Sequence, residues 1–104
     1  MTPGRILVAI AVAGLLSVPA QAETVTVTID KLVFAPVEVH AKVGDTVQWV
    51  NKDALAHTAT AKNGDWNVTI GPNKTATLAV NKAGAVDYFC KFHPNMTGRV
   101  VVSP

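Results

Sequence analysis

Three side chains that can bind a soft metal ion lie close together near the end of this 104-residue chain. A thiol, an imidazole and a thioether follow one another at Cys90, His93 and Met96, with two residues in each gap. Cys90 is the only cysteine, and Met96 is the only methionine apart from the first residue. Because a loop this short can turn all three side chains toward one point, the spacing predicts a metal site.

Three donors from one loop hold a metal weakly, so a fourth donor is expected from elsewhere in the chain. His40 alternates with Glu38 and Lys42 along a strand-like stretch and is expected on the surface. His57 follows another strand-like stretch, in a long irregular segment where small apolar neighbours would exclude water. We therefore predict that His57 supplies the second imidazole.

Two neutral imidazoles, one thiolate and a weak axial thioether form the donor set of a type 1 copper site. Thiolate and thioether favour Cu(I), whereas imidazole also suits Cu(II), so such a site can pass one electron with little rearrangement. The sequence thus predicts one copper ion held by His57, Cys90, His93 and Met96, in an electron carrier and not an enzyme. A multicopper oxidase would need many more histidines than the three present.

The same residues leave other interpretations open. Zinc shares these ligand preferences. A copper carrier or chaperone would use similar soft donors to deliver Cu(I), although such sites tend to be open and richer in Met or Cys. A Cys–His hydrolase would need an orienting third group and an oxyanion hole, which the sequence does not reveal. Without any metal, Cys90 and Met96 would be core residues and His93 a surface residue.

The pattern of residues 1–22 is typical of a leader peptide that is cleaved on export. Arg5 precedes an apolar run of about 13 residues, shorter than the roughly 20 that a membrane-spanning helix needs. Ala20-Gln21-Ala22 then offers the small residues that a signal peptidase recognises, so the cut is expected after Ala22. The mature chain would be a single domain, residues 23–104, in the periplasm and without a membrane anchor.

The charge and cysteine content argue against nucleic-acid binding and against a disulfide within the chain. Without Arg5 the chain has eight basic and seven acidic side chains, and its lysines are scattered. Nucleic-acid binding therefore lacks its usual basic patch, and the charge allows only a weak preference for acidic partners. One cysteine cannot form a disulfide within the chain, and an exported free thiol is a hazard unless a metal occupies it.

Alternation of apolar and polar residues predicts strands along most of the mature chain. Turn signals such as Val43-Gly44-Asp45 and Gly71-Pro72-Asn73 separate the alternating stretches, and no segment has a helical period. We predict an all-β fold, an antiparallel Greek-key β-sandwich of about seven or eight strands. The clearest strand-like stretches are residues 24–29, 37–43, 47–51, 75–80, 86–90 and 99–102.

At these residues the sequence resembles the cupredoxin family of type 1 blue copper proteins, and within it the amicyanin- and plastocyanin-like group. The resemblance covers essentially the whole mature chain and includes residues 43–51, His57 and residues 88–102. It implies a protein that carries electrons between transient partners, such as a dehydrogenase, a cytochrome c or a similar redox protein. A monomer is the default expectation. The resemblance also implies that electrons leave at His93 through an apolar patch, predicted to include Phe34, Pro36, Pro94 and Pro72.

Two positions depart from the pattern of this family. Thr58 stands where Asn commonly follows the first histidine, and a hydroxyl lacks the reach and the two N–H donors of an amide. No reduction potential is therefore carried over. Asn95 stands where Phe is common and makes the patch more polar. In some members the exposed histidine protonates and leaves Cu(I), and the resemblance suggests the same hypothesis for His93.

Overall fold

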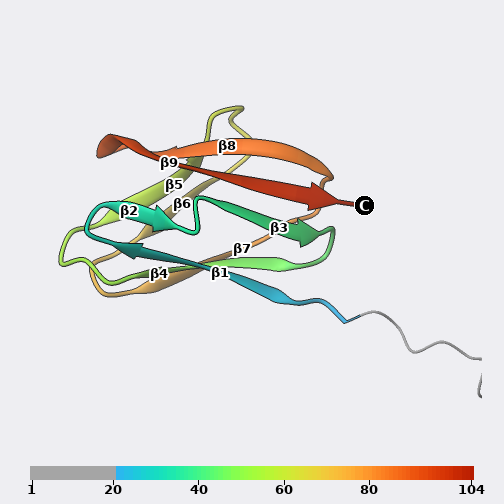
Figure 1. Cartoon of the computed structure of the whole chain (residues 1–104), viewed down its shortest axis with the longest axis horizontal. Helices are drawn as coiled ribbons and strands as arrows, with labels where there is room; N and C mark the ends of the chain where they lie inside the picture. Colours follow the sequence, from blue (N-terminus) through green and yellow to red (C-terminus); the bar gives the residue numbers. More distant parts are fainter. Residues whose placement is uncertain (1–20) are drawn as a thin grey trace, which may run out of the picture.

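The computed structural model describes residues 21–104, which form two β-sheets packed face to face (Figure 1). The predicted leader lies outside the described residues, apart from Gln21 and Ala22. Between residues 21 and 104 no helix is long and apolar enough to cross a membrane. The strands are β1 (Thr24–Asp30), β2 (Val33–Ala35), β3 (Glu38–Lys42), β4 (Thr46–Asn51), β5 (His57–Ala61), β6 (Asn67–Ile70), β7 (Thr75–Ala79), β8 (Gly84–Cys90) and β9 (His93–Ser103).

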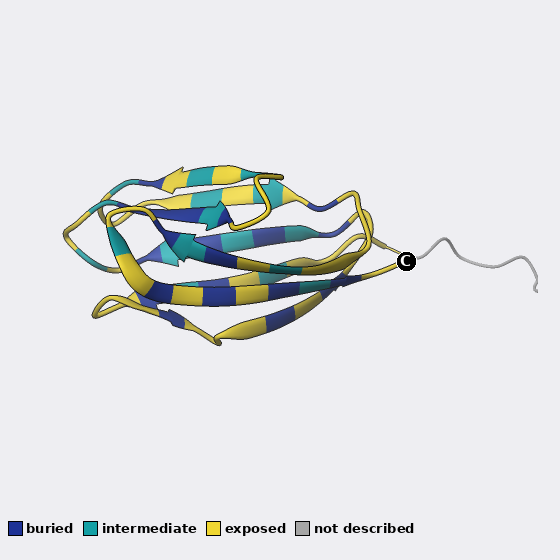
Figure 2. Cartoon of the chain, turned by 90° about the horizontal axis from the view of Figure 1, so that it is seen from above, coloured by how far each residue is buried: buried dark blue, intermediate teal, exposed yellow. Residues whose placement is uncertain are grey.

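The predicted all-β sandwich is confirmed, with nine strands in place of seven or eight. One sheet has the strand order β2-β1-β4-β7 and the other β3-β9-β8-β5-β6. Alternation along β1 and β4 places Val27, Ile29, Val47 and Trp49 in the interior with no exposed surface. The same alternation of buried and exposed residues is visible along the strands in Figure 2, as expected for sheets with one face on the core.

The expectation of a purely antiparallel sandwich is wrong for two pairs of strands. β1 pairs in parallel with β4, from Thr24 opposite Thr46 to Ile29 opposite Asn51. β3 pairs in parallel with β9. The chain leaves the first sheet after β2 and enters the second at β3, so β4 returns to the first sheet running in the same direction as β1. A crossover between the layers therefore replaces a hairpin at these positions.

The predicted secondary structure is wrong at two places in the metal site. His57 is the first residue of β5 and not part of an irregular loop. β9 begins at His93, whereas the sequence indicated a strand start near Arg99. Only Lys91 and Phe92 therefore separate β8 from β9, and Cys90 pairs directly with His93. His57, Cys90 and His93 thus lie at strand ends of one sheet, which is stiffer than a free loop.

An aromatic cluster fills the middle of the core around Tyr88. The Tyr88 ring has no exposed surface and lies 4.8 Å from Phe34 and 5.6 Å from both Trp49 and Trp66, centroid to centroid. The indole Nε1–H of Trp49 donates a hydrogen bond to the Tyr88 hydroxyl at 3.2 Å. Because Tyr88 lies two residues before Cys90 on β8, this cluster anchors the strand that carries the thiol.

The Tyr88 phenol is expected to titrate far above the usual range. Burial raises the pKa of Tyr88 to about 12, against a smaller opposing effect of the Trp49 hydrogen bond. The unfolded chain ionises this phenol near pH 10. Its contribution to the free energy of unfolding is therefore complete below pH 10 and is lost as pH rises toward 12. Tyr88 is the only tyrosine, so near-ultraviolet phenolate absorption reports it alone. A native midpoint equal to that of the urea-unfolded chain would contradict this burial.

Candidate metal centre

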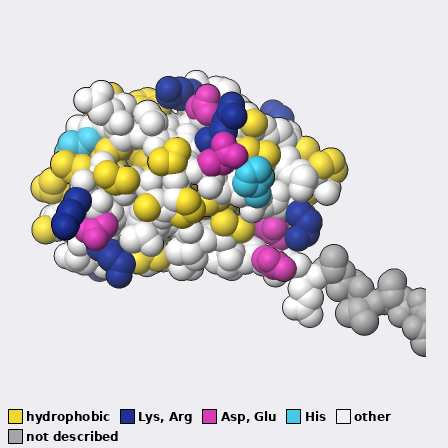
Figure 3. Space-filling model, viewed as in Figure 1, with side chains coloured by type: hydrophobic (Ala, Val, Ile, Leu, Met, Phe, Trp, Pro, Cys, Tyr) yellow, Lys and Arg dark blue, Asp and Glu magenta, His cyan; other side chains and the backbone are white. Residues whose placement is uncertain are grey.

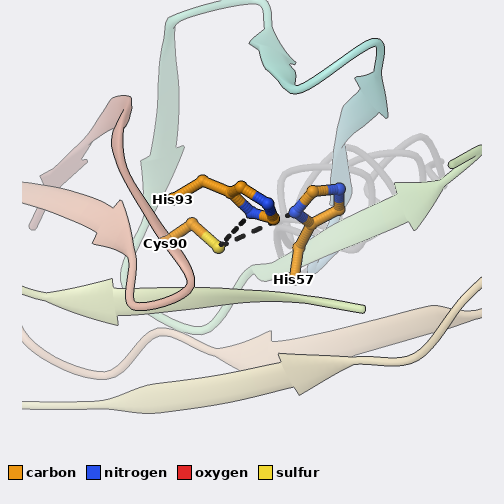
Figure 4. Close-up of side chains that lie close together, drawn as sticks. All are labelled: His57, Cys90 and His93. Atoms are coloured by element: carbon orange, nitrogen blue, oxygen red, sulfur yellow. Dashed lines mark hydrogen bonds between the residues drawn. The ribbon is translucent and has the colours of Figure 1, made fainter. Parts of the chain in front are cut away.

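His57, Cys90 and His93 converge at the end of the sandwich where β5 begins and β8 ends (Figure 4). The Cys90 Sγ lies 3.7 Å from His57 Nδ1 and 3.8 Å from His93 Nδ1. One ligand atom from each residue lies within 4.8 Å of the others. His57 and Cys90 have no exposed surface, while His93 is half-buried. Two stretches distant in sequence therefore bring three donors to one point.

The spacing of these donor atoms fits a bound metal ion. A first-row ion about 2.1 Å from each imidazole nitrogen and about 2.3 Å from sulfur, in near-trigonal geometry, separates nitrogen from sulfur by about 3.8 Å. Both observed separations are close to this value. A thiol has one proton and could donate it to only one of the two imidazoles. A cation between the three atoms satisfies both nitrogens and the sulfur, so the residues present fit a metal.

Asp53 sets the tautomer of His57, a role that the sequence interpretation missed. Asp53 Oδ2 lies 2.8 Å from His57 Nε2, and a carboxylate only accepts hydrogen bonds. His57 Nε2 therefore carries the proton, which leaves the Nδ1 lone pair facing Cys90. Burial opposes ionisation of Asp53, but hydrogen bonds from Leu32 N–H, His57 and Lys31 N–H together hold its pKa below the ordinary value. The carboxylate thus stays charged behind the imidazole.

Asp53 lies four residues before His57, but outside a helix this spacing does not by itself place a carboxylate behind the imidazole. The structure shows that it also shapes the neighbouring turn. Lys31 and Leu32 both have positive φ, at 54° and 64°, and their N–H groups donate to Asp53 at 2.7 and 3.0 Å. One carboxylate therefore fixes both His57 and the β1–β2 turn beside it.

Asn51 holds the segment that leads from β4 to His57. Its side chain is 2 % exposed, and its Nδ2 donates to the carbonyls of Leu55 at 2.8 Å and Gly71 at 3.0 Å. Its Oδ1 accepts the N–H of Asp53 at 2.9 Å. A buried amide with partners on both sides fixes the path of residues 52–56, so His57 enters β5 in a defined position.

Thr58 ties the two metal-binding stretches together, although the sequence suggested that a hydroxyl would be a poor substitute for Asn here. Its backbone N–H points at Cys90 Sγ, 3.3 Å away, and its Oγ1 accepts the N–H of Lys91 at 2.9 Å. Thr60 Oγ1 donates its proton to Asn67 Oδ1 at 2.6 Å. In the 2.9 Å hydrogen bond between the two threonine hydroxyls, Thr58 is therefore the donor and Thr60 the acceptor. The backbone and an oriented hydroxyl together link the strands.

Met96 lies three residues beyond His93, in an irregular part of β9. The pairing with β8 jumps from Cys90 opposite His93 to Phe89 opposite Thr97, so residues 94–96 leave the regular ladder. A bulge of this kind redirects a side chain. Met96 is 5 % exposed and packs in the apolar core. Its burial suits an axial ligand and also a core residue, so its ligand role stays a prediction.

Exposed apolar residues lie near His93, but not all the predicted ones. Phe34 is 1 % exposed and packs on Tyr88, so its predicted place in the surface patch is wrong. Large exposed side chains on the segments around the site are instead Leu32, Leu55 and Phe92, each 43–57 % exposed. Figure 3 shows hydrophobic side chains at this end of the molecule and across the rest of the visible face. His40, by contrast, lies on the surface against Glu38, as expected.

Replacement of Asp53 by Asn is expected to weaken metal binding about 10- to 100-fold. An amide keeps one acceptor oxygen, but it has no charge to stabilise the His57 Nε2–H and cannot accept all three observed hydrogen bonds. Competition with a chelator for Cu(II) measures the affinity. Asp65→Asn, in an exposed loop, is the matched control. Equal affinities for the two variants would show that Asp53 does not support His57.

Comparison with known proteins identifies relatives that match 75–80 % of the chain. The family model of the cupredoxin-like domain matches residues 5–102. Amicyanin of Paracoccus versutus is 37 % identical over 87 residues, which cover 78 % of this chain and 66 % of that protein. Amicyanin-alpha of Methylorubrum extorquens is 38 % identical over 89 residues, 80 % of this chain and 75 % of the relative. The chain spans 64 % of Paracoccus denitrificans amicyanin, so it matches slightly less than two thirds of both Paracoccus proteins.

Solved structures of amicyanins have the same fold. The crystal structure of amicyanin from Paracoccus versutus has a TM-score of 0.67 at 37 % identity and covers 83 % of this chain and 85 % of its own. An oxidized amicyanin carrying a Met-to-Leu substitution has a TM-score of 0.69 at 33 % identity, with 76 % and 81 % covered. Another amicyanin structure is described as a reduced Cu(I) form.

Proposed function

The chain belongs to the cupredoxin-like family, and we propose that it is an amicyanin-like type 1 copper protein that carries one electron at a time between redox proteins. The observation that carries this proposal is the convergence of His57, Cys90 and His93 with both Sγ–Nδ1 distances near 3.8 Å. We assign the ligand set as these three residues with Met96 as the axial donor. Copper bound there supplies the one-electron couple between Cu(I) and Cu(II).

The residues around the site suit a carrier that must change little when its charge changes. Asp53 and Thr58 hold the imidazole of His57 and the sulfur of Cys90 by hydrogen bonds that need no metal to form. The core behind them is packed with aromatic side chains, so the donor atoms are fixed before any electron arrives. Small rearrangement lowers the barrier to electron transfer. No catalytic step is needed for this role.

His93 is the proposed exit for electrons, because it is the only one of the three converging residues with partial exposure. Leu32, Leu55 and Phe92 supply exposed apolar surface nearby, which suits brief contact with another protein. We further propose that the protein is a monomer, that it is exported to the periplasm, and that its partners are soluble redox proteins such as a dehydrogenase or a cytochrome c.

Charge around the site favours a partner with an acidic rim. Backbone contacts tie Lys31, Lys74 and Lys91 to Asp53, Asn51 and Thr58 respectively, and Lys52 follows Asn51 directly, so four exposed lysines lie at this end. The acidic groups there are the exposed Asp30 and the hydrogen-bonded Asp53. The rest of residues 23–104 has the opposite balance, since it holds five acidic and four basic side chains. Such asymmetry steers encounter more than it strengthens binding.

Electron transfer to small redox probes tests this proposal. When ionic strength is lowered, anionic ferricyanide should oxidise the reduced, copper-loaded protein faster, because the lysines at this end attract it. Oxidation by the cationic tris(phenanthroline)cobalt(III) probe should become slower. Lys52→Glu should cut the low-salt ferricyanide rate roughly threefold, and Lys82→Glu, with the same charge change at the far end, should have little effect. A protein that releases Cu(I) to a chelator but exchanges no electrons with either probe would instead be a copper carrier.

A further inference from the structure

A buried carboxylate receives the backbone N–H of Glu23 at the end of the sandwich opposite Cys90. Asp45 is only 3 % exposed. Its Oδ1 accepts the N–H of Glu23 at 2.9 Å, and its Oδ2 accepts the N–H of Lys42 at 2.8 Å. These two hydrogen bonds, Glu23 first, hold the pKa of Asp45 below its ordinary value. A full negative charge therefore lies against the nitrogen atom of Glu23.

Both partners of this contact are already fixed by the backbone. The carbonyl of Glu23 accepts the N–H of Thr46 at 2.9 Å, one residue before β1 begins to pair with β4. Asp45 is held by its own N–H, which donates to Lys42, and by its carbonyl, which accepts the N–H of Val80, each at 2.9 Å. A charge placed on the Glu23 nitrogen would need no flexible side chain to be ordered, unlike most surface ion pairs.

The residues before Glu23 leave this junction accessible. Gln21 and Ala22 are exposed and precede the first strand. The structure also accommodates them without disturbing the Glu23–Asp45 contact. A chain that keeps residues 21 and 22 therefore has the same hydrogen bond but a neutral amide in place of an amine, and the two forms differ in charge without a steric conflict.

We propose that cleavage between Ala22 and Glu23 sets the new α-ammonium group of Glu23 on the Asp45 carboxylate, so that removal of the leader strengthens the fold. Water breaks the peptide bond, its oxygen joins the Ala22 carbonyl to form a carboxylate that departs with the leader, and the freed Glu23 nitrogen becomes a protonated amine near neutral pH. The neutral N–H···O⁻ bond thereby becomes a charge-assisted ion pair. This proposal rests on the position of the cut and not on copper binding.

The experiment compares the exported protein with a chain that begins at Gln21, at equal copper content. The mass of the exported protein should place its N-terminus at Glu23. At low salt and pH 7 its Tm should exceed that of the extended chain by about 5 °C. High salt should shrink this difference, because it screens the ion pair more than the neutral hydrogen bond.

Two substitutions separate the ion pair from other effects of the N-terminus. In an Asp45→Asn background the exported and extended chains should have equal Tm values. In a Glu23→Ala background, which keeps the amine and has no side chain that could cyclise onto it, the original difference should remain. If Asp45→Asn fails to fold, the salt dependence of the unsubstituted chains decides the question. A different N-terminus, equal Tm values at low salt, or a difference unaffected by salt would each overturn the proposal.

Discussion

Cys90→Ala is expected to abolish the intense visible absorption of the copper-loaded protein. That absorption requires a thiolate bound to Cu(II), and Cys90 is the only thiol in the chain. Its Sγ lies 3.7 and 3.8 Å from the two imidazole nitrogens, and the chain has no other thiol to take its place between them. The imidazoles of His57 and His93 would remain, and we expect them to bind Cu(II) weakly and with little colour. An absorption spectrum with one equivalent of Cu(II) measures the effect.

His40→Ala is the matched control for this experiment. His40 is exposed and contacts Glu38, so its loss should leave the spectrum unchanged. Metal analysis of both proteins must accompany the spectra, because zinc would occupy the same donors without colour. A strong visible band that persists in Cys90→Ala, or one that is missing from copper-loaded unsubstituted protein, would rule out a type 1 site at Cys90.

The convergence at the metal centre could be predicted because it depends on residue types that are rare in this chain. A single cysteine and two nearby donors at fixed spacing leave few alternatives. His57 could be separated from His40 because alternation places His40 on the outer face of a strand. The structure brings His57, Cys90 and His93 together as expected. The spacing of Met96 does not by itself fix the direction of its side chain, because residues 94–96 leave the strand ladder.

The supporting contacts were harder to predict because they depend on pairings between distant strands. Asp53 faces His57 only because Asn51 and the β1–β2 turn fix the path of the chain. The link from Thr58 to Cys90 comes from a backbone N–H, which no side-chain pattern reveals. The short strands β2 and β6 hold three and four residues, too few for a clear alternation. Parallel pairing of β1 with β4 likewise follows from the crossover between sheets, which local patterns do not encode.

Gly98→Ala is expected to destabilise the protein by about 3 kcal/mol, at the upper end of the range for overpacked cores. Gly98 lies opposite Tyr88 in the β8–β9 pair. A Cβ atom added there would lie 2.7 Å from Cε2 of the Tyr88 ring and closer still to its Cζ. The ring cannot easily move, because Phe34, Trp49 and Trp66 surround it. Urea unfolding of the apoprotein measures the loss.

Gly71→Ala is the matched control, since its added Cβ would meet only the flexible side chain of Lys74, at 3.3 Å. We expect that change to alter stability by less than about 1 kcal/mol. A double-mutant cycle identifies the cause, because Gly98→Ala should cost much less in a Tyr88→Leu background, where the ring is absent. An equal cost in both backgrounds would mean that the ring is not the obstacle.

The same substitution should also weaken the metal centre, although Gly98 does not touch it. If the Tyr88 ring holds its place, β9 must shift away from β8, and His93 and Met96 lie on β9 upstream of Gly98. If the ring yields, it loses the hydrogen bond from Trp49 and disturbs β8 two residues before Cys90. Either movement changes the separation of Cys90 from His93, which is now 3.8 Å between Sγ and Nδ1. Copper affinity should therefore fall together with stability, whereas Gly71→Ala should preserve both.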